Sequence, residues 1–282
     1  MREHGVAGRR TMQVIVGVLV AIWSLLPIYW AIVVAVSRPS DLRIKPVSIV
    51  PRSFSLDNFV SLLVPSSATG ASFLQGFANS VIQATATTVV TLLIALPASY
   101  AFARIHFRGS TVVLAVITAT FAIPVYLVLI PLFQLGVATA QLNTHQFVIL
   151  VLVSASLPLA IWILRSHIAS LPQDIESAAR LDGANTFVLI RSIIGPLIAP
   201  GLVAAAVVVF LGAWGAFLIP LVYAGTQGAQ PLTVVIPTYA TLFSSNYGLK
   251  AAAGLLAVLP PLLLVVVLQR RLLAGLLSGA VK

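Results

Sequence analysis

The sequence contains no cysteine and few charged residues. Without cysteine, the 282 residues cannot form disulfides, iron–sulfur clusters or zinc sites built on thiolates. Charged residues make up 8% of the chain and hydrophobic residues 60%, whereas a soluble domain carries roughly 25% charged residues. A soluble fold of this composition would expose large apolar patches. The composition and length therefore indicate an integral membrane protein with one membrane bundle.

Acidic residues are scarcer still, since the chain has six carboxylates, and we expect all six to lie outside the hydrocarbon core. A proton-driven carrier usually needs ionisable groups inside the membrane, although a sodium site of backbone and hydroxyl oxygens stays open. The sequence also lacks the G-x-x-x-x-G-K-[ST] phosphate loop. These absences leave a facilitator, a channel, a structural membrane subunit or one subunit of a multi-protein pump.

Long stretches without charge predict the membrane spans. A helix needs about 20 apolar residues to cross the hydrocarbon core. The first apolar run is longer than the central region of a signal peptide, so we expect it to be retained. The sequence predicts an all-α membrane protein whose transmembrane domain covers 13–269, between an N-terminal segment 1–12 and a tail 270–282. The six predicted transmembrane helices are about 13–36, 79–103, 111–135, 146–165, 198–224 and 251–269.

The basic residues predict the orientation. The net charge is +10, but lysine and arginine occur in short clusters between apolar stretches. That distribution favours lipid headgroups and membrane topology over nucleic acid as its cause. If the N-terminus is cytoplasmic, eleven of the sixteen lysines and arginines lie on the cytoplasmic side. The positive-inside rule therefore predicts that both termini are cytoplasmic.

Uncharged polar residues mark a candidate translocation path. Asn79, Gln83, Thr87 and Thr91 recur every four residues in the second predicted span, so they share one helix face. Amide and hydroxyl groups suit a neutral polyhydroxylated solute, although such groups also form hydrogen bonds between helices. Trp214 lies near the middle of the fifth predicted span. Its ring suits either stacking on a sugar or packing in the core.

The loop between the fourth and fifth predicted spans carries the most specific pattern. Glu176 and Arg180 are spaced as an i, i+4 ion pair on a short helix. Gly183 can adopt the left-handed conformation that ends such a helix, and Asn185 or Thr186 can cap a second helix. We therefore predict a helix, a glycine turn and another helix. This unit either docks on a partner protein or packs on its own bundle.

The same loop carries a family resemblance. The run ESAARLDGA, residues 176–184, resembles the EAA loop of bacterial ABC importer permeases, with Ser177 in place of the usual alanine. That loop reads Glu-Ala-Ala, a short gap and Asp-Gly-Ala, and an apolar helix and a proline follow. Four further runs resemble the maltose-type carbohydrate branch in order and spacing: FSLDNF at 54–59, Asn79-Ser80, LNT at 142–144 and GAVK at 279–282.

The resemblance implies particular roles. The loop would be a coupling helix that seats in a cleft of an ATP-binding subunit, with Glu176 and Gly183 at the docking positions. The coupling residues carried over are Glu176, Ala179, Asp182, Gly183 and Ala184, and the tail residues that would reach the ATPase subunits are Gly279, Ala280, Val281 and Lys282. Many sugar permeases have a Trp-Asn pair in the fifth span. Here Trp214 is followed by Gly215, so a polar group is missing there.

The function that the resemblance implies is that of a permease subunit in the cytoplasmic (inner) membrane of a bacterium. The chain would form half of the translocation path for a sugar and would not itself be an enzyme. The expected partners are a second permease, two ATP-binding subunits, an extracellular solute-binding protein and lipid, but no nucleic acid. ATP and magnesium would bind to the partner subunits, and we expect no cofactor or metal in this chain. The alternatives are an importer for a glycerophosphodiester or polyol, and a stand-alone facilitator or channel.

Overall fold

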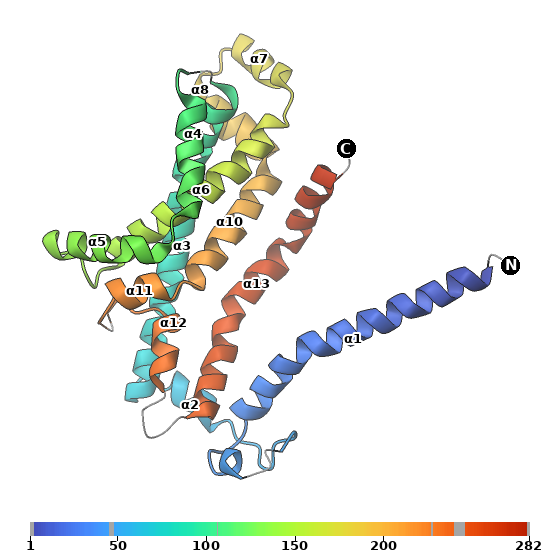
Figure 1. Ribbon diagram of the computed structural model, residues 1–282, viewed down its shortest axis with the longest axis vertical. Helices are drawn as coiled ribbons and strands as arrows, with labels where there is room; N and C mark the ends of the chain where they lie inside the picture. The colour runs from blue at the N-terminus through green and yellow to red at the C-terminus, as the bar shows by residue number, and fades with distance from the viewer. Residues whose placement is uncertain (1–2, 45–47, 106, 227, 240–245, 281–282) are drawn as a thin grey trace. The chain divides into compact units, whose positions relative to one another are not determined.

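The computed structural model describes residues 3–44, 48–105, 107–226, 228–239 and 246–280. All regular elements in these ranges are helical (Figure 1). The chain divides into two compact units. The first unit comprises Met1–Leu74 with Ile236–Val258, and the second comprises Gln75–Val235 with Leu259–Lys282. Two long helices, α3 (Ala68–Arg104) and α13 (Tyr247–Ala280), contribute to both units.

The helices confirm an all-α membrane architecture. Four segments in the described part of the chain are each long and apolar enough to cross a membrane: Met12–Ala35, Ala68–Arg104, His145–Ala169 and Tyr247–Gln269. Two bent helix pairs bring the number to six if each pair counts as one span: Ser110–Ala122 with Val125–Ala138, and Thr186–Leu197 with Ala199–Trp214. The structure thus contains four to six spans, and six are expected from the sequence.

The first unit is built on α1 (Glu3–Ala35), a helix that carries no charged residue from Thr11 onward. Its side chains from Met12 to Trp30 are all exposed, as expected for a helix that lipid surrounds. The short helix α2 (Asp57–Leu63) closes the end of α1, because Asn58 Nδ2 donates a hydrogen bond to the Ala35 carbonyl at 2.8 Å. Ordinary helix-end chemistry therefore joins the two elements.

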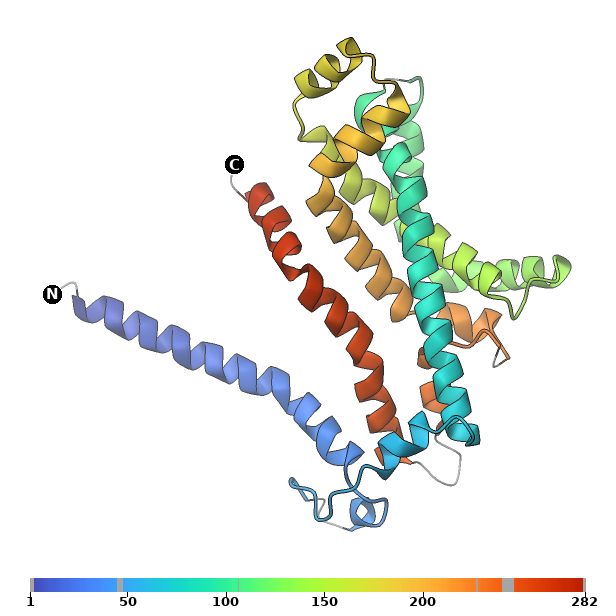
Figure 2. The same ribbon diagram turned by 180° about the vertical axis from the view of Figure 1, so that it is seen from behind.

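The second unit is a bundle in which α3, α6 (His145–Ala169) and α10 (Ala199–Trp214) lie side by side (Figures 1 and 2). One buried cluster joins these helices to α7 (Gln173–Leu181) and to the turns that follow α7. Most residues of this cluster are alanine, valine, leucine and isoleucine. Close packing rather than polar contact therefore holds the helices together. The buried members of the cluster include Ala95, Tyr100, Ala160, Leu164, Ile168, Ala179, Leu189, Ile194 and Ala205.

The third predicted span, 111–135, is not one helix. The structure has α4 (Ser110–Ala119), a short 3₁₀ turn η2 (Thr120–Ala122) and α5 (Val125–Ala138), with a bend of 99° between the helices. The break falls at Ile123, whose φ of −80° and ψ of 112° are extended. A following proline disfavours helical backbone at the residue before it, and Pro124 follows Ile123. Proline chemistry thus divides this span.

The fifth predicted span, 198–224, is also divided. The helix α10 ends at Trp214, Gly215 follows it as the cap, and α11 (Leu218–Tyr223) begins after a short break. A second break of 83° precedes α10. Short helical pieces precede and follow this divided span: α8 (Thr186–Val188), the π turn η3 (Leu189–Ile194), α9 (Gly195–Leu197), α12 (Leu232–Val235) and the 3₁₀ turn η4 (Ile236–Tyr239). In the first unit, the 3₁₀ turn η1 (Asp41–Arg43) follows α1.

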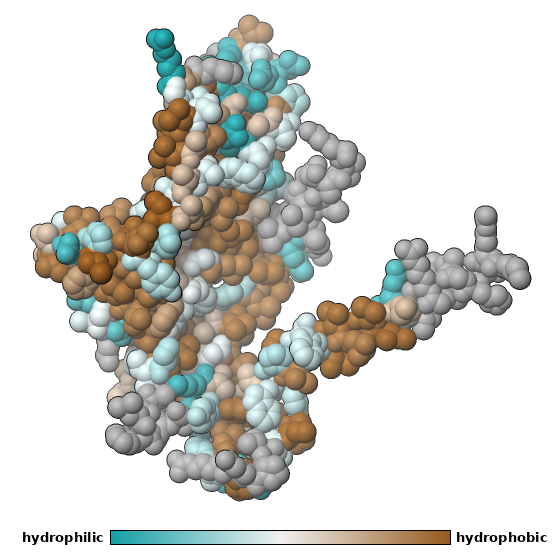
Figure 3. Space-filling view, viewed as in Figure 1, coloured by the Kyte–Doolittle hydropathy of each residue, from teal (hydrophilic) through white to brown (hydrophobic). Residues whose placement is uncertain are grey.

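The helix α7 lies at one end of the second unit, beyond the ends of α6 and α10 (Figure 1). Hydrophilic side chains gather at this end in the space-filling view, whereas apolar side chains cover the helices below it (Figure 3). The end that carries α7 therefore has the polarity of a surface in water, and the sides of the bundle have that of a surface in lipid.

Candidate functional site

The α7 turn has the local structure that its sequence predicts. Gly183 has a φ of +86°, in the left-handed region that glycine enters at least cost. The N–H groups of Gly183 and Ala184 donate to the carbonyls of Arg180 and Ala179 at 3.1 and 3.0 Å, which closes the helix. Asn185 Oδ1 accepts a hydrogen bond from the Val188 N–H at 2.9 Å and caps α8. The predicted glycine turn and helix cap are both confirmed.

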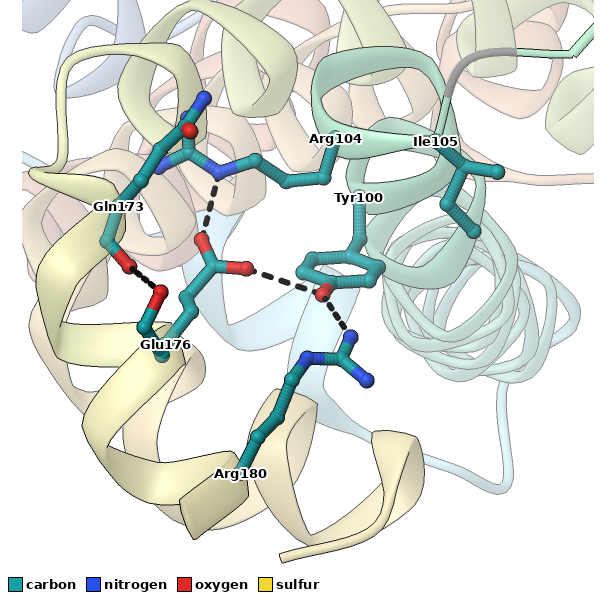
Figure 4. A pocket seen from close by; sticks show the side chains of 7 residues that line it. Tyr100, Arg104, Ile105, Gln173, Glu176 and Arg180 are labelled. Atoms are coloured by element: carbon teal, nitrogen blue, oxygen red, sulfur yellow. Dashed lines mark hydrogen bonds and ion pairs between the residues drawn. The ribbon is translucent and has the colours of Figure 1, made fainter.

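Glu176 is the buried centre of the candidate site. It is 7% exposed, although it lies in the first turn of a short polar helix. The Tyr100 hydroxyl donates to Oε2 at 3.0 Å, and Arg104 Nε donates to Oε1 at 2.5 Å. Figure 4 shows the carboxylate between these two side chains of α3. The carboxylate is therefore hydrogen-bonded to its own chain through both oxygens.

Arg104 and Arg180 extend this arrangement. Arg104 Nη2 donates to the Leu171 carbonyl at 2.7 Å, so one guanidinium holds both the loop before α7 and the helix itself. Arg180 Nη2 donates to the Tyr100 hydroxyl at 3.2 Å. The predicted i, i+4 pairing of Glu176 with Arg180 is thus wrong as the main contact. Glu176 has a better-buried partner in Arg104, because both side chains of that pair are over nine-tenths buried.

Helix dipoles reinforce the arrangement. Arg104 lies in the last turn of α3 and Glu176 in the first turn of α7. A cation is favoured at a helix C-terminus and an anion at a helix N-terminus. Each charged group is therefore stabilised by the helix that carries it, as well as by its partner. We call the three residues Tyr100, Arg104 and Glu176 the α3–α7 anchor.

A pocket adjoins the α3–α7 anchor. Its volume is about 270 Å³, and it is lined by Tyr100, Arg104, Ile105, Gln173, Glu176, Ser177 and Arg180 (Figure 4). Two guanidinium groups and one carboxylate face this space, so its formal charge is positive. Arg180 is exposed at its edge. The pocket leaves the anchor accessible to water from one side while the carboxylate itself stays buried.

The polar face of α3 lies further along the same helix. Asn79, Gln83, Thr87 and Thr91 are all 2% exposed or less. Asn79 Nδ2 donates to the Gln230 carbonyl at 2.9 Å, and Gln83 Nε2 donates to the Ala229 carbonyl at 2.6 Å. These two amides hold the segment before α12. The hydroxyls of Thr87 and Thr91 are buried without a hydrogen-bond partner.

Trp214 is brought near the start of this face. It is 9% exposed and stacks on Phe210, with ring centroids 5.8 Å apart. Its edge-to-face partner is Phe77 of α3, at 6.1 Å. Aromatic packing of this kind occupies the faces and edges of the indole. In this structure Trp214 is therefore a packed core residue.

A family model decides what kind of protein this geometry belongs to. Residues 95–277 match the family described as the inner membrane component of binding-protein-dependent transport systems. The chain belongs to this family. The matched segment contains the α3–α7 anchor, the glycine turn and α10. The permease is thus a multi-pass inner membrane protein and a non-enzymatic component of an importer that has other subunits.

Two relatives extend the likeness over the whole permease. It is 32% identical to the trehalose transport system permease protein of Mycobacterium tuberculosis, over 98% of this chain and 99% of the relative. It is 29% identical to the trehalose/maltose transport system permease protein of Thermococcus litoralis, over 100% and 99% of the two chains. The fold resembles a chain of a bacterial ABC transporter that imports alginate, with a TM-score of 0.81 and 19% identity over 96% and 98% of the two chains.

Other predicted site residues of the permease have different surroundings. Asp182 and Gly183 are exposed beside the turn, and Ala179 is buried against the bundle. Gly279 and Ala280 end α13, whereas Val281 and Lys282 lie outside the described residues. Sequence reasoning missed Tyr100 and Arg104 as site residues. Their spacing of four at the end of a span was the available signal, because it places both on one helix face.

Proposed function

We propose that the permease forms half of the translocation path for a sugar and couples it to ATP hydrolysis in partner subunits. Two of its relatives carry trehalose or maltose in their names, which supports a disaccharide or similar sugar. The partners would be a second permease, two ATP-binding subunits and an extracellular solute-binding protein. ATP and magnesium would bind to the ATP-binding subunits, and no cofactor would bind to this chain.

The observation that carries the proposal is the two-sided nature of α7. Glu176 and Ala179 face the permease itself, whereas Leu181 is 90% exposed at the end of the helix. An apolar side chain so exposed at the polar end of the unit suits a protein partner. We therefore assign Asp182, Gly183 and Ala184, beside Leu181, to contact with the ATPase. Glu176 and Ala179 would serve the coupling from the inner side of α7.

The orientation follows from the same assignment. With α7 in the cytoplasm, eleven of the sixteen lysines and arginines lie on the cytoplasmic side. Both termini would then be cytoplasmic, and the tail Gly279, Ala280, Val281 and Lys282 would reach the ATPase subunits. No nucleic acid is expected as a partner, because the basic residues are distributed between spans rather than on one face.

The polar face of α3 is our proposed contribution to the translocation path. Thr87 and Thr91 support it, because their buried hydroxyls have no hydrogen-bond partner in this conformation. A buried hydroxyl without a partner is costly, and a solute hydroxyl would supply one. Asn79 and Gln83 would join the path only if the segment that they hold moves. Trp214 would contribute its ring only if Phe210 moves away.

Reconstitution tests the proposed function. The permease, its second permease and its ATP-binding subunits are placed in liposomes, and ATP hydrolysis is measured with trehalose or maltose and the solute-binding protein. We expect hydrolysis and solute uptake only when all components are present. Solute uptake by the permease alone, without ATP or partners, would contradict the proposal and favour a facilitator or channel.

A further inference from the structure

Two charged groups of α7, those of Glu176 and Arg180, are held by one helix of the permease. Four hydrogen bonds link the α7 segment to the last two turns of α3: Tyr100 to Glu176, Arg104 to Glu176, Arg104 to the Leu171 carbonyl, and Arg180 to Tyr100. The two α3 residues are spaced by four, as are the two α7 residues. One turn of each helix therefore faces one turn of the other.

This arrangement ties Glu176 to its own chain. Its side chain is 9% exposed, and Arg104 and Tyr100 occupy one carboxylate oxygen each. Each carboxylate oxygen can accept a second hydrogen bond, so a second protein could add a donor, but it could not replace Arg104 without leaving a buried guanidinium unpaired. Losing one partner of a buried ion pair is strongly unfavourable. These contacts therefore support a role for Glu176 inside the permease, in addition to the docking on the ATPase that the sequence predicts.

We propose that Tyr100 and Arg104 are positioning residues, which with Glu176 fasten α7 to α3 so that the two helices move as one body during coupling. The proposal rests on the proposed function, since it assumes that α7 receives a movement from an ATP-binding subunit. Without the anchor, α7 would follow the ATPase while α3 stayed behind. ATP would then be hydrolysed with less solute transported.

Because α3 also carries the polar face, a movement of α7 can reach that face through α3. The helix continues from Tyr100 to Gln83 without a break, about 25 Å at the rise of an α-helix. At Gln83 and Asn79 the same helix holds the carbonyls of Ala229 and Gln230. A shift of α7 that α3 shares would thus reach the polar face and the segment before α12. These contacts form a contiguous chain of packed and hydrogen-bonded groups.

A first experiment tests the anchor without any ATPase. Hydrogen–deuterium exchange of the α7 amides is measured in the full chain in lipid nanodiscs, for Arg104→Gln, Glu176→Gln and the double variant. Each single variant is expected to speed exchange about tenfold, because a hydrogen bond to a charged group is lost in a buried site. The double variant should be less affected than the two effects combined predict, because neither charge is then left unpaired.

Two exposed residues provide matched controls. Arg108→Gln removes a cation four residues after Arg104, beyond the end of α3, and Asp174→Asn removes an acid from the first turn of α7; both residues are exposed. Neither should change the exchange of α7. Wild-type exchange in Arg104→Gln, or single effects that combine without coupling in the double variant, would overturn the anchor.

A second experiment tests the positioning role in the reconstituted importer. The number of ATP molecules hydrolysed per solute transported is measured for Arg104→Gln and for Tyr100→Phe, which keeps the buried ring and loses only the hydroxyl. We expect this ratio to rise in both variants. A merely structural defect would lower the amount of importer and leave the ratio unchanged, and that result would overturn the proposal.

The outcomes separate this proposal from the proposed function. If the wild-type importer shows no solute-stimulated ATP hydrolysis, the proposed function fails, whatever the exchange data show. If the wild-type importer works and only Glu176→Gln raises the ratio, with Arg104→Gln and Tyr100→Phe normal, Glu176 contacts the ATPase directly. In that case the proposed function stands and the positioning role of Tyr100 and Arg104 is wrong.

Discussion

The two polar regions of α3 both bind this helix to another segment of the chain, but they do so with different chemistry. In its N-terminal half, Asn79 and Gln83 donate from neutral amides to backbone carbonyls. At its C-terminal end, Arg104 and Tyr100 donate to the carboxylate of Glu176. Both regions are buried. One, however, contains no charge, whereas the other contains an ion pair.

The difference follows from the surroundings of the two regions, which are hydrocarbon for one and water for the other. The helix is 37 residues long, or about 55 Å, which exceeds the roughly 30 Å of hydrocarbon in a bilayer. An ionised group in the hydrocarbon costs several kcal/mol, so neutral amides suit the part of the helix within it. The C-terminal end adjoins a polar pocket (Figure 4). An ion pair there keeps contact with water on one side.

Among the substitutions that test this comparison, Arg104→Leu is expected to have the largest effect on the stability of the permease. It leaves the buried Glu176 carboxylate without its cation and should destabilise the permease by about 3 kcal/mol. Thermal unfolding in detergent measures the change. The matched control is Arg108→Leu at an exposed position, which should stay within about 0.5 kcal/mol. Equal effects of the two variants would show that the ion pair contributes nothing beyond its surroundings.

Gln83→Leu tests the neutral region and should have an intermediate effect. The Ala229 carbonyl loses its donor, and a buried unsatisfied carbonyl costs about 2 kcal/mol. The same unfolding measurement applies, with Gln141→Leu as the control because Gln141 is exposed. If Gln83→Leu unfolds like the wild type, packing can replace the hydrogen bond from the Gln83 amide to the Ala229 carbonyl.

Gly183→Ala should have the smallest effect, because it changes the backbone rather than a polar contact. A side chain at a φ of +86° costs about 1 kcal/mol. No atom lies within 4 Å of the added carbon, so the cost is conformational alone. Gly212→Ala is the control, since it also has open space but lies inside α10. That variant should be neutral or stabilising.

The features that depend on nearby residues could be predicted from the sequence. The uncharged runs indicated the membrane helices, because charge is excluded from hydrocarbon. Gly183 indicated the turn and Asn185 the cap, since both act within a few residues of themselves. The same local reasoning misled at Glu176. It selected Arg180, four residues away, over Arg104, which is 72 positions away in the sequence.

The other differences between the predicted and the observed structure also have physical causes. Proline is tolerated in spanning helices, so Pro124 did not reveal the bend of 99° that it allows between α4 and α5. The carbonyls that Asn79 and Gln83 bind lie in a segment without periodicity, and no local pattern connects them to α3. Contacts of this kind depend on the packing of distant helices.

The most direct test of the account is whether α3 and α7 keep their distance while the importer works. The absence of native cysteine permits spin labels at Leu93→Cys on α3 and Asp174→Cys on α7, two exposed positions of the second unit. Pulsed electron resonance measures their separation in the reconstituted importer with and without ATP. The account predicts the same distance distribution in both states. A distance that changes with ATP would contradict it.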